Sequence, residues 1–224
     1  MVQTSEHIIS RAIGVYREDI KTDELCELIE LERDVFNSYF DSVDDLWRES
    51  YVAFLDAAVD AMSALPDIDD SLIQERLATL VFILLDVLEE HQSYVNQTFR
   101  RFAAGFKSPF QQALRDQLGR IVESPDVPGI NQLIFGHNAS LFVLSESIVQ
   151  LINIWRSDDS TQRERSSALI DRYVSFWTEI ISSGVPERTV DLIRYSIEAD
   201  YLPLKNVPFV KDWFRSNTSE PDSQ

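Results

Sequence analysis

Glycine, cysteine and long apolar runs are scarce in this chain of 224 residues, which has six glycines and one cysteine. A single cysteine excludes an internal disulfide framework and a thiolate metal cluster, so we expect Cys26 to be a small buried apolar residue. The sequence has no run of eighteen consecutive apolar residues, and its first ten residues lack the cationic start and apolar core of a secretory signal. These absences predict a cytoplasmic protein without a membrane partner.

Lysine is scarce as well, because only Lys21, Lys107, Lys205 and Lys211 are present. The chain has 38 acidic and 20 basic residues, a formal net charge of −18. Such a surface repels polyanions at low salt. Two explanations remain open: the protein avoids nucleic acid, or it works in a salt-rich cell, where repulsion is screened within about 3 Å at about 1 M salt. The acidic excess is spread along the whole chain, which favours the second explanation.

Apolar residues recur at helical spacing throughout, and no segment alternates as a half-buried strand would, so we predict an all-α fold. Residues 1–47 form a small module of three short helices, and residues 48–224 form a larger helical domain. Ser42 followed by Asp45 has the form of a capping box, and Ser108-Pro109 is typical of a helix start. Helices are expected over residues 5–16, 22–29, 32–40, 43–64, 71–91, 94–106, 109–122, 131–156 and 160–183, with a loop over 124–129.

The last two expected helices each carry more apolar surface than one packing face needs. One face must be buried in the chain's own body, and the simplest cover for the other is a second copy, which predicts a homodimer built on a four-helix interface. The alternative is that both helices lie at the centre of a monomeric bundle. The residues assigned to the dimer interface are Leu141, Leu144, Ile148, Leu151, Trp155, Tyr173, Trp177 and Ile181.

Enzyme motifs are absent from the sequence: there is no glycine-rich phosphate loop, no Gly-x-Ser-x-Gly elbow and no His-Glu-x-x-His zinc signature. Neighbouring acids such as Glu89-Glu90 point about 100° apart on a helix and cannot face one substrate together. Neither His91 nor His137 follows an acid at the spacing of helical di-iron sites. We therefore assign no catalytic residue, no metal ligand and no cofactor.

The run RDVFNSYFDSVDDLW, residues 33–47, resembles the recognition helix and the start of the fourth helix in the tetracycline-repressor (TetR) family. Phe36 takes the large apolar place, Tyr39-Phe40 the aromatic pair, Asp41-Ser42 the turn and Asp45-Leu46 the acid and leucine. Upstream, Leu25, Cys26 and Glu27 stand where the family often has Ile-Ala-Glu. The resemblance implies an N-terminal helix-turn-helix DNA-binding domain, a helical effector-binding and dimerisation domain, and a regulator whose effector shifts the two reading heads.

On that resemblance, the third helix lies in the major groove of a duplex operator, where Arg33 pairs with guanine and Asn37 reads adenine. The other residues assigned to DNA contact are Lys21, Thr22, Ser38, Tyr39 and Ser42. A small apolar or mixed-polarity effector is held in the body, with His137 and Asn138 as its polar anchors. The apolar residues assigned to the effector cavity are Tyr94, Phe99, Phe102, Phe106, Phe135 and Phe142.

The N-terminal module is acidic, because residues 1–50 hold 5 basic and 13 acidic side chains, a net of 5 − 13 = −8. Phosphate contacts supply much of the affinity for DNA, so this charge opposes DNA binding. Two hypotheses follow. The first is a homodimeric, ligand-responsive transcriptional regulator, in the simplest case a repressor. The alternative is a TetR-like fold that has lost DNA binding and works as a ligand-sensing or protein-interaction module.

Overall fold

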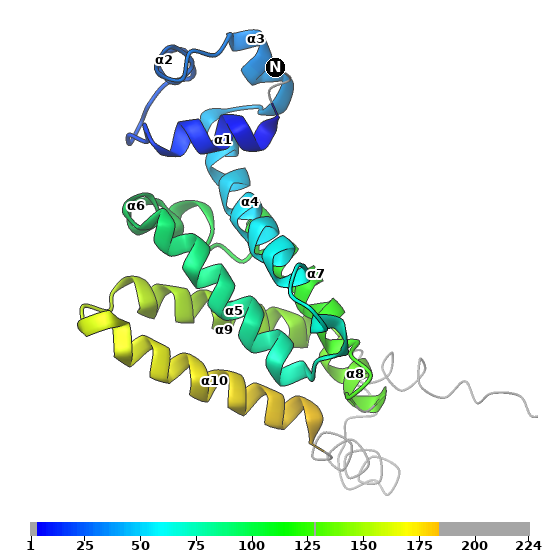
Figure 1. Ribbon diagram of the computed structural model, residues 1–224. Coiled ribbons are helices and arrows are strands. Elements are labelled where there is room, and N and C mark those ends of the chain that lie inside the picture. The colour runs from blue at the N-terminus through cyan, green and yellow to red at the C-terminus, as the bar shows by residue number, and fades with distance from the viewer. Residues whose placement is uncertain (1–3, 128, 184–224) are drawn as a thin grey trace, which may run out of the picture.

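The computed structural model describes residues 4–127 and 129–183 (Figure 1), and every regular element in this part of the chain is helical. The prediction of an all-α fold is confirmed. No helix in the described ranges is both long enough and apolar enough to cross a bilayer. The elements in chain order are α1 (Ser5–Ile13), α2 (Thr22–Leu28), α3 (Arg33–Tyr39), α4 (Val43–Ser63), η1 (Ile68–Asp70), α5 (Ile73–Glu90), α6 (Gln92–Phe102), α7 (Pro109–Val122), α8 (Gly129–Phe135), α9 (Asn138–Arg156), η2 (Thr161–Arg163) and α10 (Glu164–Ser182).

Two helix starts follow the capping chemistry in the sequence. The Ser42 hydroxyl accepts a hydrogen bond from the backbone N–H of Asp45 at 3.1 Å and caps α4. The Ser108 hydroxyl accepts from the backbone N–H of Gln111 at 3.1 Å, and proline occupies the first position of α7. Each bond satisfies a backbone donor that has no partner within its own helix. Both predicted starts are therefore confirmed.

The single helix predicted over 131–156 is wrong, because α8 ends at Phe135 and α9 begins at Asn138. The break lies at Gly136, whose backbone approaches Gln132 so closely that a Cβ atom would come within 2.6 Å of the Gln132 carbonyl oxygen. The next side chain, His137, accepts a hydrogen bond at Nδ1 from the backbone N–H of Ala139 and caps α9. Gly184, expected to close the last helix, lies outside the described residues.

The core follows α4, which contacts α1 at one end and α5, α6 and α7 along its length. In Figure 1, α1, α2 and α3 lie at one end of α4, α5, α6 and α7 lie along its other part, and α10 lies on the far side of α5. We call residues 4–42 the head and the remaining described residues the body. Cys26 is buried in the head, as predicted. The largest fully buried side chains include Phe36, Trp47, Tyr51, Phe99 and Phe110.

Candidate functional site

The outer end of the head is formed by α2, a short turn and α3 (Figure 1). Leu25 on α2 and Phe36 on α3 are fully buried and fix both helices to the core of the head. The turn is closed by a hydrogen bond of 2.8 Å from the backbone N–H of Leu31 to the carbonyl of Cys26. Within this turn Glu30 has a left-handed backbone with φ of 49°, a conformation that costs a non-glycine residue about 1–2 kcal/mol.

The residues assigned to DNA contact lie on the surface of the head. Arg33, Asn37 and Tyr39 are exposed on α3, and Lys21 is exposed at the N-cap position of α2, where its side chain makes no cap bond. Two of the remaining residues have local roles, since the Ser38 hydroxyl donates to the Val35 carbonyl at 2.6 Å and Ser42 caps α4. Their exposure leaves them accessible to a partner, and the DNA contacts themselves remain a prediction.

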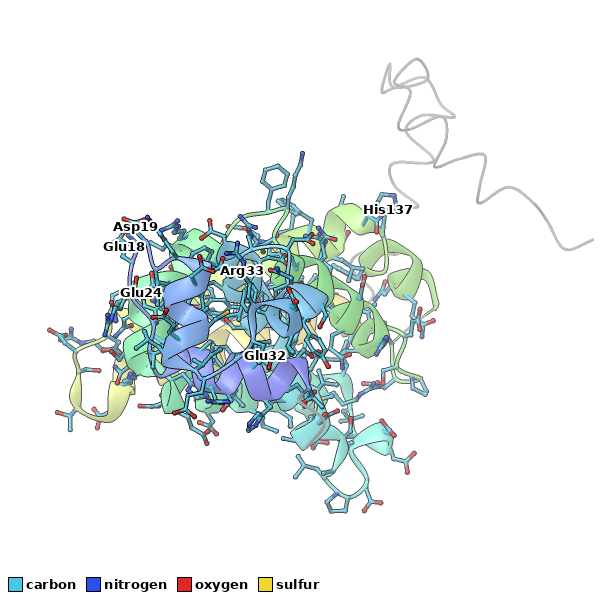
Figure 2. All side chains as sticks on the ribbon, turned by 90° about the horizontal axis from the view of Figure 1, so that it is seen from above. Glu18, Asp19, Glu24, Glu32, Arg33 and His137 are labelled. Atoms are coloured by element: carbon cyan, nitrogen blue, oxygen red, sulfur yellow. The ribbon has the colours of Figure 1, made fainter. Side chains whose placement is uncertain are left out.

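Two cations of the head are paired with acids on α2. Arg33 lies 2.5 Å from Asp23, and Arg17 lies 3.2 Å from Glu24, with all four side chains exposed to solvent. In the view down onto the head, Glu18, Asp19 and Glu24 gather at one edge and Arg33 lies nearer the middle (Figure 2). Exposed pairs are worth about 0–1 kcal/mol each, so a phosphate can displace either one. The excess acids remain and make the outer surface of the head negative.

A cluster of aromatic rings joins the head to the body, and we call it the neck. The Tyr16 ring, which follows α1, lies with its centroid 5.2 Å from Trp47 on α4 and 5.3 Å from Tyr94 on α6. Trp47 and Tyr94 also contact each other, with centroids 5.7 Å apart. Outside this cluster, Arg101 of α6 lies 3.5 Å from Asp44 of α4. The position of the head therefore depends on the packing of α4 against α6.

Two short hydrogen-bond chains cross between α4 and α6 at the neck. Thr98 donates to the Tyr94 carbonyl at 2.7 Å, so the Tyr51 hydroxyl is the donor in its 2.7 Å bond with Thr98. Ser50 donates to the Trp47 carbonyl at 2.9 Å, so the Tyr94 hydroxyl is the donor in its 2.8 Å bond with Ser50. Burial raises the pKa of both tyrosines well above the ordinary range. These hydroxyls are therefore neutral donors at physiological pH.

The residues assigned to an effector cavity separate into two groups. Tyr94, Phe99 and Phe102 are buried in the core around α6, where Phe99 packs edge-on against Tyr51 and Phe110. Phe106, Asn138 and Phe142, from the loop after α6 and from α9, instead line one open hollow of about 510 Å³ on the surface. His137 is exposed as the cap of α9, and Phe135 is buried at the end of α8.

The hollow also contains residues that sequence reasoning missed, above all Lys107 and Arg115. The same is true of the neck, since sequence reasoning assigned Tyr16, Trp47 and Tyr51 to no site. One signal in the sequence was available for the hollow, since Lys107 is the only lysine between residues 22 and 204.

The residues assigned to a dimer interface lie almost entirely in the chain's own core. Leu144, Ile148 and Ile181 are nearly inaccessible, and Leu141, Leu151 and Trp155 are also buried. The reason is that the stripe of Leu144 on α9 packs against α7. The stripe of Ile181 on α10 packs against α5 and α8. Of the assigned set only Tyr173 and Trp177 are partly exposed. A second copy would therefore meet a different set of side chains.

The apolar side chains that remain exposed form two stripes on α9 and α10. Val143 and Ile154 are eleven residues apart on α9 and therefore share one face, as do Leu169 and Phe176 on α10. A 2.7 Å hydrogen bond between Ser147 and the Tyr173 hydroxyl joins the stripes. We call this surface the α9–α10 face.

A smaller hollow of about 360 Å³ lies between α1, the end of α3 and α4. Four carboxylates line it, those of Glu6, Asp45, Glu49 and Asp56. Partial burial raises the pKa of Glu49, and the neighbouring charges of Asp45 and Asp56 raise it further. The pKa of Asp56 is raised by burial and by Asp60 and Glu6. This cluster is a local source of repulsion at the base of the head.

Comparison with known proteins identifies neither a matching family model nor a similar curated protein.

Proposed function

We propose that this protein is a homodimeric, ligand-responsive transcriptional regulator, in the simplest case a repressor, with a fold like that of the TetR family. The α2–turn–α3 unit is its helix-turn-helix, and α3 enters the major groove of duplex DNA. One observation carries the proposal: α3 lies at the outer end of the head and exposes Arg33, Asn37 and Tyr39, while Phe36 anchors it from behind. An exposed Arg and Asn on one short helix suit the reading of guanine and adenine.

The neck supports the regulatory part of the proposal. Tyr16 places an aromatic ring of the head against both α4 and α6, and α6 continues into the loop at the surface hollow. A ligand that shifts α6 therefore moves groups in direct contact with the head. Regulation of this kind requires only that the ligand bind the two arrangements of α6 with different affinity.

The α9–α10 face supports the dimer. Exposed apolar stripes on two adjacent antiparallel helices suit an isologous interface, in which the same surface of both copies meets in a four-helix arrangement. Phe176 exposes 57% of its surface and Val143 exposes 52%. Single exposed apolar side chains are common on monomers, whereas several on one surface mark an interaction site. The proposed interface thus involves the same two helices as the sequence prediction, but a neighbouring face of each, about 100° around the helix.

The second candidate function is a ligand-sensing or protein-interaction module without DNA binding. The observation that favours it is the charge of the head, together with the engagement of Arg33 and Arg17 by Asp23 and Glu24. A surface of this sign raises the free energy of approach to DNA at low salt.

A selection of bound duplexes from a random DNA pool, at about 0.1 M and about 1 M salt, tests the choice between these functions. Enrichment of a palindromic site that is lost with Arg33→Ala and Asn37→Ala, and kept with Arg172→Ala on the exposed surface of α10, supports the regulator. No enrichment at either salt concentration rejects DNA reading and leaves the sensing module.

A further inference from the structure

The surface hollow of about 510 Å³ lies where the α6–α7 loop, α7 and the first turns of α9 meet. Its volume is within the range of sites that hold small molecules, about 300–1,000 Å³. It is open on one side, and its walls come from two stretches of the chain, residues 106–116 and 138–142. We call it the α7–α9 hollow.

Two aromatic rings face solvent at this hollow. Phe106, in the loop, exposes 57% of its surface, and Phe142, on α9, exposes 37%. Gly105, next to Phe106, has no neighbouring atom within 4 Å of the position that a Cβ would occupy, so the loop is open at this point. Two exposed phenylalanines from different elements offer a flat apolar group a place between them, which removes apolar surface from water.

The hollow also has cations without carboxylate partners. Neither Lys107 nor Arg115 forms an ion pair with any residue in the described ranges. The Lys107 ammonium lies 5.4 Å from the centroid of the Phe106 ring. The Arg115 guanidinium is oriented by bonds from Nη1 to the Gln111 side chain at 3.1 Å and to the Phe106 carbonyl at 3.4 Å. Lys107 thus lies near the ring of Phe106, and Arg115 bonds to the backbone carbonyl of the same residue.

The charge of the hollow is opposite to that of the whole protein. Two cations and one acid, Asp116, line it, a formal charge of +1, whereas the chain carries −18. In addition, α9 begins at Asn138 on the hollow's wall, and the N-terminus of a helix adds roughly half a positive charge. The site therefore attracts anions on a protein whose remaining surface repels them.

We propose that the α7–α9 hollow binds a small aromatic carboxylate, with its ring against Phe106 and Phe142 and its carboxylate at Lys107 and Arg115. An apolar ligand would leave both cations without an anionic partner, and an organic cation would meet repulsion from them. A bidentate carboxylate also matches the planar guanidinium of Arg115.

The position of the hollow gives such a ligand a route to the head. The loop that carries Phe106 and Lys107 follows directly on α6, whose Tyr94 and Thr98 hold α4 at the neck. A carboxylate bridging Lys107 on the loop and Arg115 on α7 fixes the end of α6 relative to α7. The role of this ligand as effector rests on the function proposed above, whereas its binding does not.

The test is calorimetric titration of the full chain with 1-naphthaleneacetate, and with 1-naphthylmethanol and 1-naphthylmethylammonium as neutral and cationic analogues. We expect the anion to bind about tenfold more tightly than either analogue at low salt. Lys107→Gln should weaken it about 2- to 5-fold, as for loss of one exposed ion pair, and Phe106→Ala about 3- to 10-fold. Arg120→Gln, an exposed cation on α7 outside the hollow, and Leu72→Ala, an exposed apolar side chain at the start of α5, should leave the affinity unchanged.

Equal binding of the three analogues, or equal affinity in wild type and Lys107→Gln, would overturn the proposal. Both Lys107 and Phe106 are exposed, so their variants should keep the wild-type circular dichroism spectrum. The two proposals fail separately. Naphthaleneacetate binding without DNA enrichment rejects only the regulator, and DNA enrichment without naphthaleneacetate binding rejects only the carboxylate site.

Discussion

Replacement of Tyr51 by phenylalanine should lower the free energy of unfolding by about 1 kcal/mol. Tyr51 is fully buried, and its hydroxyl donates to Thr98 at 2.7 Å. The ring stays in place in the variant, so no cavity forms. Thr98 keeps its own bond to the Tyr94 carbonyl and loses only one donor to its oxygen. The cost is therefore that of one neutral hydrogen bond.

Replacement of the partner in this bond, Thr98→Val, should lower the free energy of unfolding by more than Tyr51→Phe does. Valine has nearly the same shape, but it leaves the Tyr51 hydroxyl as a buried donor without its partner, which costs about 1–3 kcal/mol. In the double variant both polar groups are gone and no donor is stranded. We therefore expect the double variant to lose about 1 kcal/mol less than the sum of the single variants.

Urea denaturation followed by circular dichroism at pH 7 and fixed protein concentration measures this coupling. Thr178→Val provides the matched control, since Thr178 is buried on α10 and its hydroxyl donates to the Val174 carbonyl one turn earlier. Combined with Tyr51→Phe, this control should be additive. Additivity within about 0.3 kcal/mol for Tyr51→Phe with Thr98→Val would refute the reasoning, because the bond would then carry no energy between α4 and α6.

Three further predictions concern other parts of the molecule. Because the pKa of Glu49 is raised in the folded protein, the contribution of Glu49 to the free energy of unfolding is most favourable at acidic pH and is lost as pH rises through the folded pKa. In urea titrations, Glu49→Gln should therefore raise the free energy of unfolding at pH 7 by less than about 1 kcal/mol and change it little near pH 4. Phe176→Glu, on the α9–α10 face, should shift the protein to monomers in sedimentation. Leu72→Glu, outside that face but with the same exposed fraction of 57%, should leave the dimer intact. Dimers in both variants would exclude the α9–α10 face as the interface. Glu30→Gly should raise the free energy of unfolding by about 0.5–1 kcal/mol, because glycine adopts the left-handed backbone of this position without strain. The control Glu27→Gly, within α2, should lower the free energy of unfolding by about 1 kcal/mol, and a larger loss from Glu30→Gly than from Glu27→Gly would show that the backbone at Glu30 is not strained.

Local chemistry made part of the fold predictable. The caps at Ser42 and Ser108 depend on residues within three positions of each other, and the structure forms both bonds. The break between α8 and α9 was missed, although Gly136, His137 and Asn138 interrupt the apolar spacing after Phe135. Its cause is a close approach of the backbone to Gln132, which the sequence pattern does not record.

Tertiary packing decided the rest. Helices α9 and α10 each have two apolar faces, and the pattern alone does not tell which one the body covers; the structure buries the face of Leu144 and leaves that of Val143 exposed. The α7–α9 hollow shows the same limit, since Phe106, Arg115 and Phe142 come from separate elements and meet only in the folded chain. The resemblance to the TetR family assigned both phenylalanines to a cavity inside the body.

The acidic head allows one more prediction, on the salt dependence of DNA binding. Of the five cations in residues 1–50, Arg33 is assigned to guanine and Arg17 is paired with Glu24, which leaves three for phosphates, 5 − 2 = 3. Three phosphate contacts give a slope of log affinity against log salt of about −3, and screening of the repulsion from the thirteen acids makes it shallower. A regulator with six to ten phosphate contacts would lose far more affinity over the same range. Between about 0.1 M and about 1 M salt an enriched duplex should therefore lose at most about a thousandfold in affinity, and a slope steeper than about −5 would mean that cations outside residues 1–50 contact the DNA.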